Sequence, residues 1–195
     1  TAIHRLHHRY SDQKGDPHSP RDGKWWAHML WIVRGKALHS NTIAVGEFAP
    51  DLMKDRFYRV LSIWHWVPLA LLGIILFSVG GWSWLLWGVF FRVVVGLHST
   101  WLVNSVCHLR GTRRFETSDT SRNCSWVALL TFGEGWHNNH HAQPTVAKFG
   151  FVWWEIDLLG TQITLLERLG LAWDVKRQKK TQASLVKVAH SQPVN

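Results

Sequence analysis

This sequence has few cysteines and few acidic residues, and its central part is almost free of charged residues. It has only Cys107 and Cys124 among 195 residues, which excludes a disulfide-stapled scaffold and predicts two reduced thiols. Acidic residues number 13, against 22 lysines and arginines. From Val60 to Phe91 the sequence has no Asp, Glu, Lys or Arg, and after Arg92 it has none up to Cys107. An uncharged block of this length is typical of membrane-spanning segments.

Basic residues lie on both sides of the uncharged block. Ten Lys and Arg residues precede Val60 and eleven follow Cys107, so that Arg92 alone lies between them. A nucleic-acid-binding protein would gather its basic residues on a recognition face, so we expect no nucleic acid partner. The flanking pattern indicates an integral, multi-pass membrane protein with its basic segments on the cytosolic side, and the 14 tryptophans suit a membrane interface.

The block is long enough for two spans of about 20 residues each. Gly80 and Gly81 mark the predicted break, so we place the spans at residues 60–79 and 82–103. The connecting turn has no charge and belongs on the far side of the membrane from the basic segments. We therefore predict an all-α membrane protein in which a transmembrane helical hairpin joins a cytosolic helical cap.

The flanking segments show helical patterns separated by turns. Residues 1–11 are predicted to end a helix, residues 24–33 to form an amphipathic interfacial helix, and Pro50 to start another helix. A helix-like stretch at 126–141 and an amphipathic helix at 150–170 follow. The first residue already falls in a helical pattern, so we expect an amino-terminal part to be missing. The predicted organisation has four parts, which are 1–59, 60–103, 104–175 and a basic tail at 176–195.

Two groups among the 13 histidines have the same spacing. Residues 4–8 (HRLHH) and residues 137–141 (HNNHH) each have histidines at positions i, i+3 and i+4. These positions share one face of a helix, so each group points three imidazoles the same way. Two copies of the pattern make chance a poor explanation. The predicted hairpin has an even number of spans, which places both groups on one side of the membrane, where they can share a metal cluster.

A third element joins the two groups. Asn104 and His108 lie one helical turn apart where the second predicted span ends, and we favour a ligand role for His108. The seven candidate histidines are too many for one ion and suit two ions with five or six ligands each. Imidazole binds iron, copper, nickel and zinc, so the residue types alone do not choose the metal. The remaining histidines are interpreted as non-ligands: His18, His28, His39, His65, His98 and His190.

These motifs resemble those of the membrane fatty acid desaturases, in the stearoyl-CoA or delta-9 branch. The family's second histidine box, HRxHH with an aspartate-rich loop after it, is matched at residues 4–19. Its TWLVNS element and the histidine that follows are matched at 100–108, and its third box, GEGxHNxHH, at 133–141. Residues 169–173 also resemble the family. The family's first box, HxxxxH, supplies two iron ligands and has no match, so we expect this fragment to lack a complete centre.

The resemblance implies an oxygen-dependent fatty acyl desaturase. It implies two iron ions as cofactor, O2 as co-substrate, an acyl-CoA or acyl-lipid substrate, a cis double bond at the delta-9 position, and cytochrome b5 or ferredoxin as electron donor. Asn104 would act through a bound water. Acceptors for the second ring N–H of the ligand histidines are expected among Glu134, Asp12 and Asp16. The implied metal ligands are His4, His7, His8, His108, His137, His140 and His141.

Trp101 and Trp136 adjoin the motifs and are candidates to shape an acyl channel. Two other functions stay open, a related hydroxylase of lipids or carotenoids and a non-enzymatic membrane metal-binding or transport protein. The element around Asn104 and the wording of the third box favour the desaturase, and ligands at span ends count against transport. Four basic residues are interpreted as positive-inside charges rather than as a site for an acyl-carrier phosphate or an acidic donor: Arg9, Lys14, Arg113 and Arg114.

Overall fold

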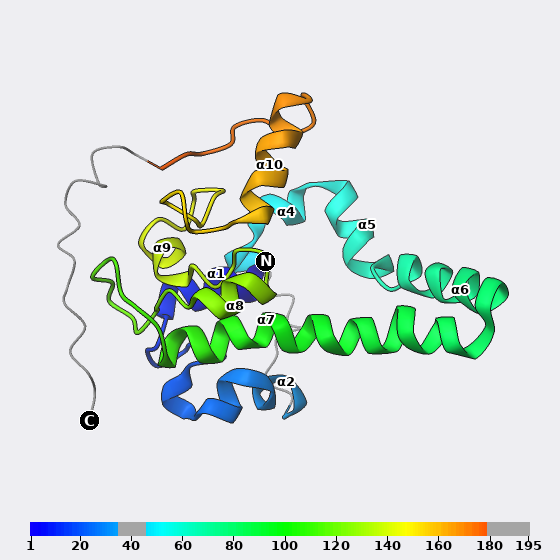
Figure 1. The fold of residues 1–195 in the computed structure, drawn as a ribbon, viewed down its shortest axis with the longest axis horizontal. Coiled ribbons are helices and arrows are strands. Elements are labelled where there is room, and N and C mark those ends of the chain that lie inside the picture. Colours follow the sequence, from blue (N-terminus) through cyan, green and yellow to red (C-terminus); the bar gives the residue numbers. More distant parts are fainter. Residues whose placement is uncertain (35–45, 179–195) are drawn as a thin grey trace.

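The computed structural model describes residues 1–34 and 46–178, which are mainly helical (Figure 1). Within these two ranges there is no β-strand, and isolated bridges join Thr112 to Asn123 and Asn123 to Trp136. The predicted helical class is confirmed for this part of the chain, and most of the predicted tail at 176–195 lies outside it. The helices are α1 (Ala2–Tyr10), the 3-10 helix η1 (Pro20–Asp22), the π-helix η2 (Trp26–Leu30), α2 (Trp31–Val33), α4 (Pro50–Lys54), α5 (Arg56–Trp64), α6 (Val67–Leu85), the π-helix η3 (Leu86–Phe91), α7 (Arg92–Leu109), α8 (Ser125–Leu130), α9 (His137–Ala142) and α10 (Leu158–Arg168).

One helical segment, Val67–Leu109, is long and apolar enough to cross a membrane. It is not continuous in direction, because Gly81 has φ 62° and ψ −152°, a conformation that residues with a side chain rarely adopt. The chain reverses there, and α6 packs against η3, which continues into α7, so that the three elements form a helical hairpin (Figure 1). The reversal falls at the break that Gly80 and Gly81 predicted.

The first arm of the hairpin begins later than predicted. Helix α5 ends at Trp64, and α6 begins at Val67 with Pro68 in its first turn. Proline has no backbone N–H and a fixed φ, so it is tolerated at the start of a helix but interrupts one that is already formed. Residues 60–64 therefore belong to α5 and not to the first predicted span.

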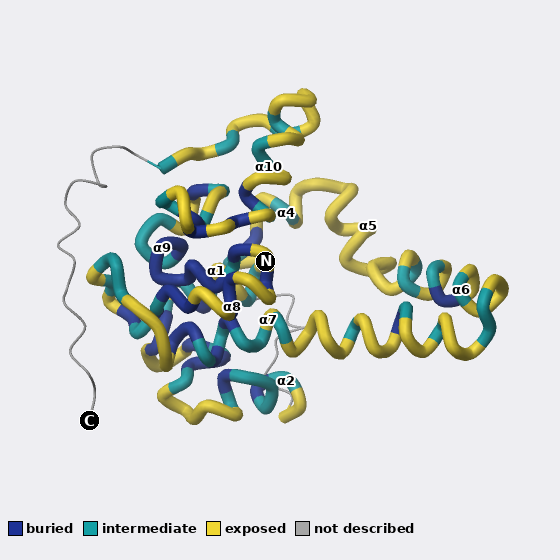
Figure 2. Tube along the Cα trace, viewed as in Figure 1, coloured by how far each residue is buried: buried dark blue, intermediate teal, exposed yellow. Residues whose placement is uncertain are grey.

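The buried core lies at one end of the molecule, away from the hairpin turn. Figure 2 shows dark blue segments gathered around α1, α8, α9 and the carboxyl end of α7, whereas the hairpin is mainly exposed. The apolar part of this core is small and contains Val103, Cys107, Cys124 and Val127. Both cysteines are free thiols. The hairpin surface is apolar, with side chains such as Ile74 and Trp82 more than half exposed.

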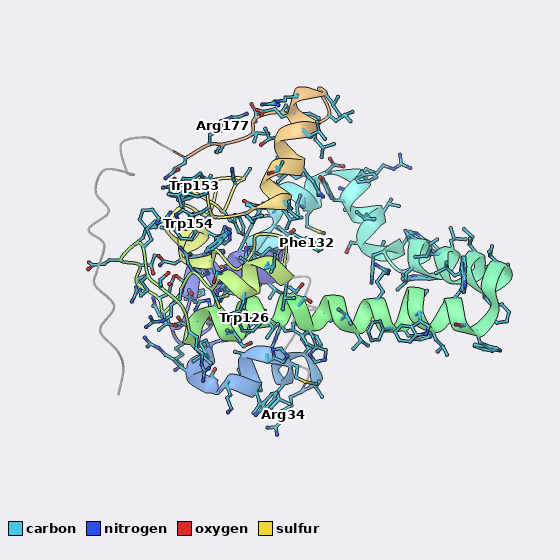
Figure 3. All side chains as sticks on the ribbon, in the orientation of Figure 1. Arg34, Trp126, Phe132, Trp153, Trp154 and Arg177 are labelled. Carbon is cyan, nitrogen blue, oxygen red and sulfur yellow. The ribbon has the colours of Figure 1, made fainter. Side chains whose placement is uncertain are left out.

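Two predicted helices are shorter than the sequence pattern indicated. The stretch at 126–141 divides into α8 and α9, because Phe132 and Gly133 both adopt positive φ between them. The predicted helix at 150–170 is helical only from Leu158 onward. Its first residues form a tight loop whose surface carries Trp153 and Trp154 (Figure 3).

Two buried carboxylates hold that loop. Asp157 accepts hydrogen bonds from the backbone N–H groups of Phe149 at 2.6 Å and Gly160 at 2.7 Å, and so begins α10 as its N-cap. Glu155 accepts from the N–H of Phe151 at 2.7 Å. These bonds satisfy backbone groups that a helix would otherwise have paired, which is why apolar spacing alone misplaced the helix start.

Candidate metal centre

Seven histidines from three helices converge at the buried end of the molecule. Helix α1 supplies three of them, α7 supplies one near its carboxyl end, and α9 supplies three. Their ring nitrogens form two groups, within each of which all the donor atoms lie within 4.8 Å of one another. The four-histidine site contains His7, His108, His137 and His141, and the three-histidine site contains His4, His8 and His140.

The four-histidine site is fully buried. The Nε2 atom of His137 lies 3.1 Å from Nε2 of His108 and 3.0 Å from Nε2 of His141. His7 joins them from α1, with its ring centroid 5.3 Å from that of His108 and 5.2 Å from that of His141. The site therefore combines one residue from α1 and one from α7 with two from α9.

The three-histidine site lies beside it and is open on one side. Nε2 of His140 lies 3.2 Å from Nε2 of His4 and 2.9 Å from Nε2 of His8, and the last two atoms are 3.1 Å apart. His140 is buried, His8 is half-buried and His4 is exposed. The i, i+3 and i+4 spacing of the sequence thus splits each histidine group between two sites.

Three carboxylates fix the tautomers of the rings. Asp12 lies 3.1 Å from Nδ1 of His108, and Asp119 lies 2.7 Å from Nδ1 of His141. Asp16 contacts Nδ1 of His7 with both oxygens at 3.0 Å. An ionised carboxylate accepts only, so each Nδ1 carries the proton and each Nε2 presents its lone pair.

This proton assignment makes the four-histidine site a fit for a cation. The Nε2 lone pairs of His108 and His141 both face Nε2 of His137, which carries at most one proton and cannot satisfy both. Nδ1 of His137 is also buried, with no hydrogen-bond partner in the described part of the chain. Facing lone pairs in a dry site repel, and a metal ion at their common focus turns that repulsion into coordination.

The protonation states agree with a ligand role. Desolvation by the surrounding protein atoms, with repulsion from neighbouring histidines, lowers the pKa of His4 to about 4, although part of that residue is exposed, and those of His8 and His140 to about 2. The same causes hold the pKa of His137 well below its usual value. Burial alone would raise the pKa of Asp119, but the hydrogen bond from His141 lowers it. These shifts keep His4, His8, His137 and His140 neutral and Asp119 ionised at pH 7, as metal binding requires.

The remaining predicted site residues lie in several places. Asp12 and Asp16 contact histidines of the four-histidine site, whereas Glu134 lines a cavity with Arg92 and has no hydrogen bond to a histidine in the described ranges. Burial first, and then the nearby Asp157, raises the pKa of Glu134. Glu134 is therefore not among the carboxylates that orient the histidines.

The polar and aromatic candidates are more scattered. Asn104 is half-buried on α7, one turn before His108. Trp136 is buried, and its Nε1–H donates to the carbonyl of Ile156 at 2.8 Å. Trp101 lies on another part of α7, with its ring 5.0 Å from that of His98.

Sequence reasoning missed two residues near the centre. Asp119 orients His141 but lies in a loop without periodicity, and no motif includes it. His18, predicted to be a non-ligand, stacks on His7 with ring centroids 4.2 Å apart and forms a further group of possible ligand atoms with His7 and Asp16. The position of His18, in the aspartate-rich loop that follows the histidines of residues 4–8, could have indicated that it lies near the centre.

Comparisons with known proteins agree with this geometry. A family model described as fatty acid desaturase matches residues 1–159. An sn-1 stearoyl-lipid 9-desaturase of Anabaena variabilis is 45% identical over 93% of this chain, and one of Synechocystis is 44% identical over 92%. An sn-2 palmitoyl-lipid 9-desaturase of Nostoc is 44% identical over 87%. The chain spans 65%, 56% and 60% of the lengths of these relatives.

Proposed function

Because the chain belongs to the fatty acid desaturase family, we propose that it takes part in oxygen-dependent desaturation of a saturated acyl chain, with a cis double bond introduced at the delta-9 position. Relatives named 9-desaturases, at 44–45% identity, support this position. The observation that carries the proposal is the convergence of seven imidazoles on two adjacent sites.

Each of the two sites holds one iron ion in this proposal. The four-histidine site supplies four nitrogens and the three-histidine site supplies three, to which Asn104 adds a contact through water. An unactivated methylene C–H bond has no acidic proton, so the bound iron pair, with O2, supplies the oxidising chemistry that side chains lack. The protein supplies ligand geometry, which Asp12, Asp16 and Asp119 maintain by holding the rings in one tautomer.

The acyl chain is assigned to a cavity of about 570 Å³ along α7. Its lining is mainly apolar and includes Phe91, Val95, Leu130 and Phe132. Glu134, three residues before the first histidine of α9, also lines it. An apolar cavity with few polar groups is the kind of site that binds an acyl chain.

The hairpin of α6 and α7 is assigned to the bilayer. Its composition and exposed apolar surface support this placement. Both ends of the hairpin then lie on the side that carries the histidines and the basic segments, which is the cytosolic side by the positive-inside rule. The electron donor, cytochrome b5 or ferredoxin, approaches from the same side.

The proposal is tested by expressing the coding region that contains this chain in a host without delta-9 desaturase. Gas chromatography with mass spectrometry of the fatty acids is expected to show a new delta-9 cis monounsaturated product. His140→Ala should abolish the product, because His140 belongs to the three-histidine site, whereas His65→Ala should retain it, because His65 is exposed and belongs to neither site. A product that retains an oxygen atom would instead identify a hydroxylase.

A further inference from the structure

A second cavity, separate from the histidine sites, lies where the segment at 24–30 packs against the carboxyl end of α7. Its volume is about 390 Å³. Lys24, Trp25 and His28 line it on one side, and Ser105 and Arg110 line it on the other. Figure 1 shows this segment, which leads into α2, running beside α7 on the face opposite α8. The cavity thus joins two elements that both adjoin the proposed bilayer.

The mouth of the cavity has two cations and no acid. Neither Lys24 nor Arg110 has a side-chain partner among residues 1–34 and 46–178, and both are exposed. At the end of α7, the carbonyls of Val106 and Cys107 already accept the backbone N–H groups of Arg110 at 2.7 Å and Arg122 at 2.6 Å. The cavity therefore has an unbalanced positive charge that suits an anion.

A chain of hydrogen bonds makes the wall of the cavity rigid. The Ser105 hydroxyl donates to the carbonyl of Trp101 at 2.8 Å, so it accepts from Nδ1–H of His28 at 3.1 Å. Nε2 of His28 then accepts from Nδ1–H of His98 at 3.0 Å. Burial lowers the pKa of His28, which keeps the ring neutral for this relay. These hydrogen bonds hold the segment that carries Lys24 against α7. Lys24 and Arg110 therefore both line the same cavity.

The depth of the cavity matches that of lipid headgroups. An α-helix rises about 1.5 Å per residue. Ser105, in the arm of the hairpin that follows Gly81, therefore lies about 36 Å from the turn. The hydrocarbon core of a bilayer is about 30 Å thick, and about 40–45 Å with its headgroups. Ser105 then lies in the headgroup layer. Beside it, Trp25 is 62% exposed and Leu109 is 47% exposed, which provides apolar contacts next to the charges.

We propose that this cavity binds the phosphate headgroup of an anionic bilayer phospholipid. Lys24 and Arg110 pair with the phosphate, while Trp25 and Leu109 contact the glycerol and the first methylenes of the lipid. The inference rests on the proposed placement of the hairpin in the bilayer. It assigns the lipid to a site outside the acyl cavity, which lies on other residues of α7.

The test titrates the detergent-solubilised full chain with phosphatidylglycerol and measures binding by native mass spectrometry. Combined Lys24→Ala and Arg110→Ala should weaken binding about 25-fold, because each basic residue near an anionic lipid contributes roughly fivefold. The matched control combines Lys14→Ala and Lys148→Ala, which removes the same charge from exposed positions elsewhere and should change binding less than about threefold.

Further measurements separate the possible failures. Val106→Trp fills the cavity without changing its charge and should also abolish binding; retained binding would overturn the proposal. If the Lys24/Arg110 and the Lys14/Lys148 double variants lose lipid binding equally, the lipid does not bind selectively at this cavity, and the proposal is overturned. Displacement of the lipid by inorganic phosphate or coenzyme A would make a soluble phosphate the occupant and overturn the lipid assignment. Release of the chain from membranes by alkaline carbonate would overturn the placement of the hairpin in the bilayer. If the chain stays in the membrane but binds the lipid unselectively, only the assignment of the lipid to this cavity is overturned.

Discussion

The Nδ1 atom of His141 lies 2.7 Å from a carboxylate oxygen of Asp119, the shortest histidine–carboxylate contact at the two sites. The other oxygen of Asp119 accepts from the backbone N–H of Ser121 at 2.9 Å and from the hydroxyl of Thr117 at 2.8 Å. One side chain thus shapes the loop at 117–121 and fixes the tautomer of a ring in the four-histidine site. The two roles can be separated by mutation, because an amide keeps an oxygen acceptor.

Asp119→Asn should lower iron affinity by about 10-fold to 100-fold while the fold is retained. The amide oxygen still accepts from Ser121 and Thr117, but the amide nitrogen now faces His141 and favours the wrong tautomer. Iron per chain, measured by inductively coupled plasma mass spectrometry after dialysis against a graded chelator, checks this. Asp22→Asn, at an exposed position in η1, serves as the control. Full iron retention in the Asp119 variant would contradict the orienting role.

Glu155→Ala should destabilise the buried end of the molecule by about 3–5 kcal/mol. The carboxylate is buried, forms an ion pair with Arg114 at 2.7 Å, and accepts from the side-chain amide of Asn139 at 2.9 Å. Its removal leaves Arg114 without its partner and releases Asn139 within the third histidine motif. Chemical denaturation of the detergent-solubilised chain measures the loss. Glu116→Ala, at an exposed position of the loop at 110–118, should change stability by less than about 0.5 kcal/mol.

Stability of the metal-free chain should fall as the pH is lowered from about 6.5 toward 4. The pKa of His4 is about 4 and those of His8 and His140 are about 2, all below the ordinary value of 6.5. In this window the unfolded chain binds protons that the folded chain does not, so the free energy of unfolding decreases with falling pH. The lowered pKa of Asp119 adds no loss here, because its contribution disappears only below its ordinary value of 3.8.

Denaturant titrations of chelator-treated protein at several pH values between 7.5 and 4.5 measure this dependence. His4→Gln combined with His8→Gln should flatten the slope, because two of the groups that titrate only in the unfolded chain are gone. His65→Gln, at an exposed position outside the two histidine sites, serves as the matched control. A stability that rises on acidification would contradict the buried, neutral state of these rings.

The sequence predicted those features whose signal is local. Histidines at i, i+3 and i+4 share a helix face, so the spacing in residues 4–8 and 137–141 indicated both groups, and two glycines within an apolar run indicated the reversal at Gly81. The carboxylate partners were predicted only in part. Asp12 and Asp16 lie in a loop next to the first group, whereas Asp119 is 22 residues from His141 and becomes its neighbour only through folding.

The predicted helix at 150–170 begins too early because contacts formed only on folding were not visible in the sequence. Apolar spacing in residues 150–157 resembles a helix, but Glu155 and Asp157 accept the backbone N–H groups of Phe149, Gly150 and Phe151 and stabilise a loop instead. Such competition between side chain and backbone depends on burial of the carboxylates, which periodicity does not reveal.

The contact between α1 and α9 also sets an order of events during synthesis. His4 and His140 meet at 3.2 Å but are 136 positions apart, so α1 leaves the ribosome long before its partner exists. The hairpin of α6 and α7 is made between them. Metal loading of the three-histidine site is therefore a late step of biogenesis, which follows translation of the hairpin, and a chain truncated before α9 retains only two of that site's imidazoles.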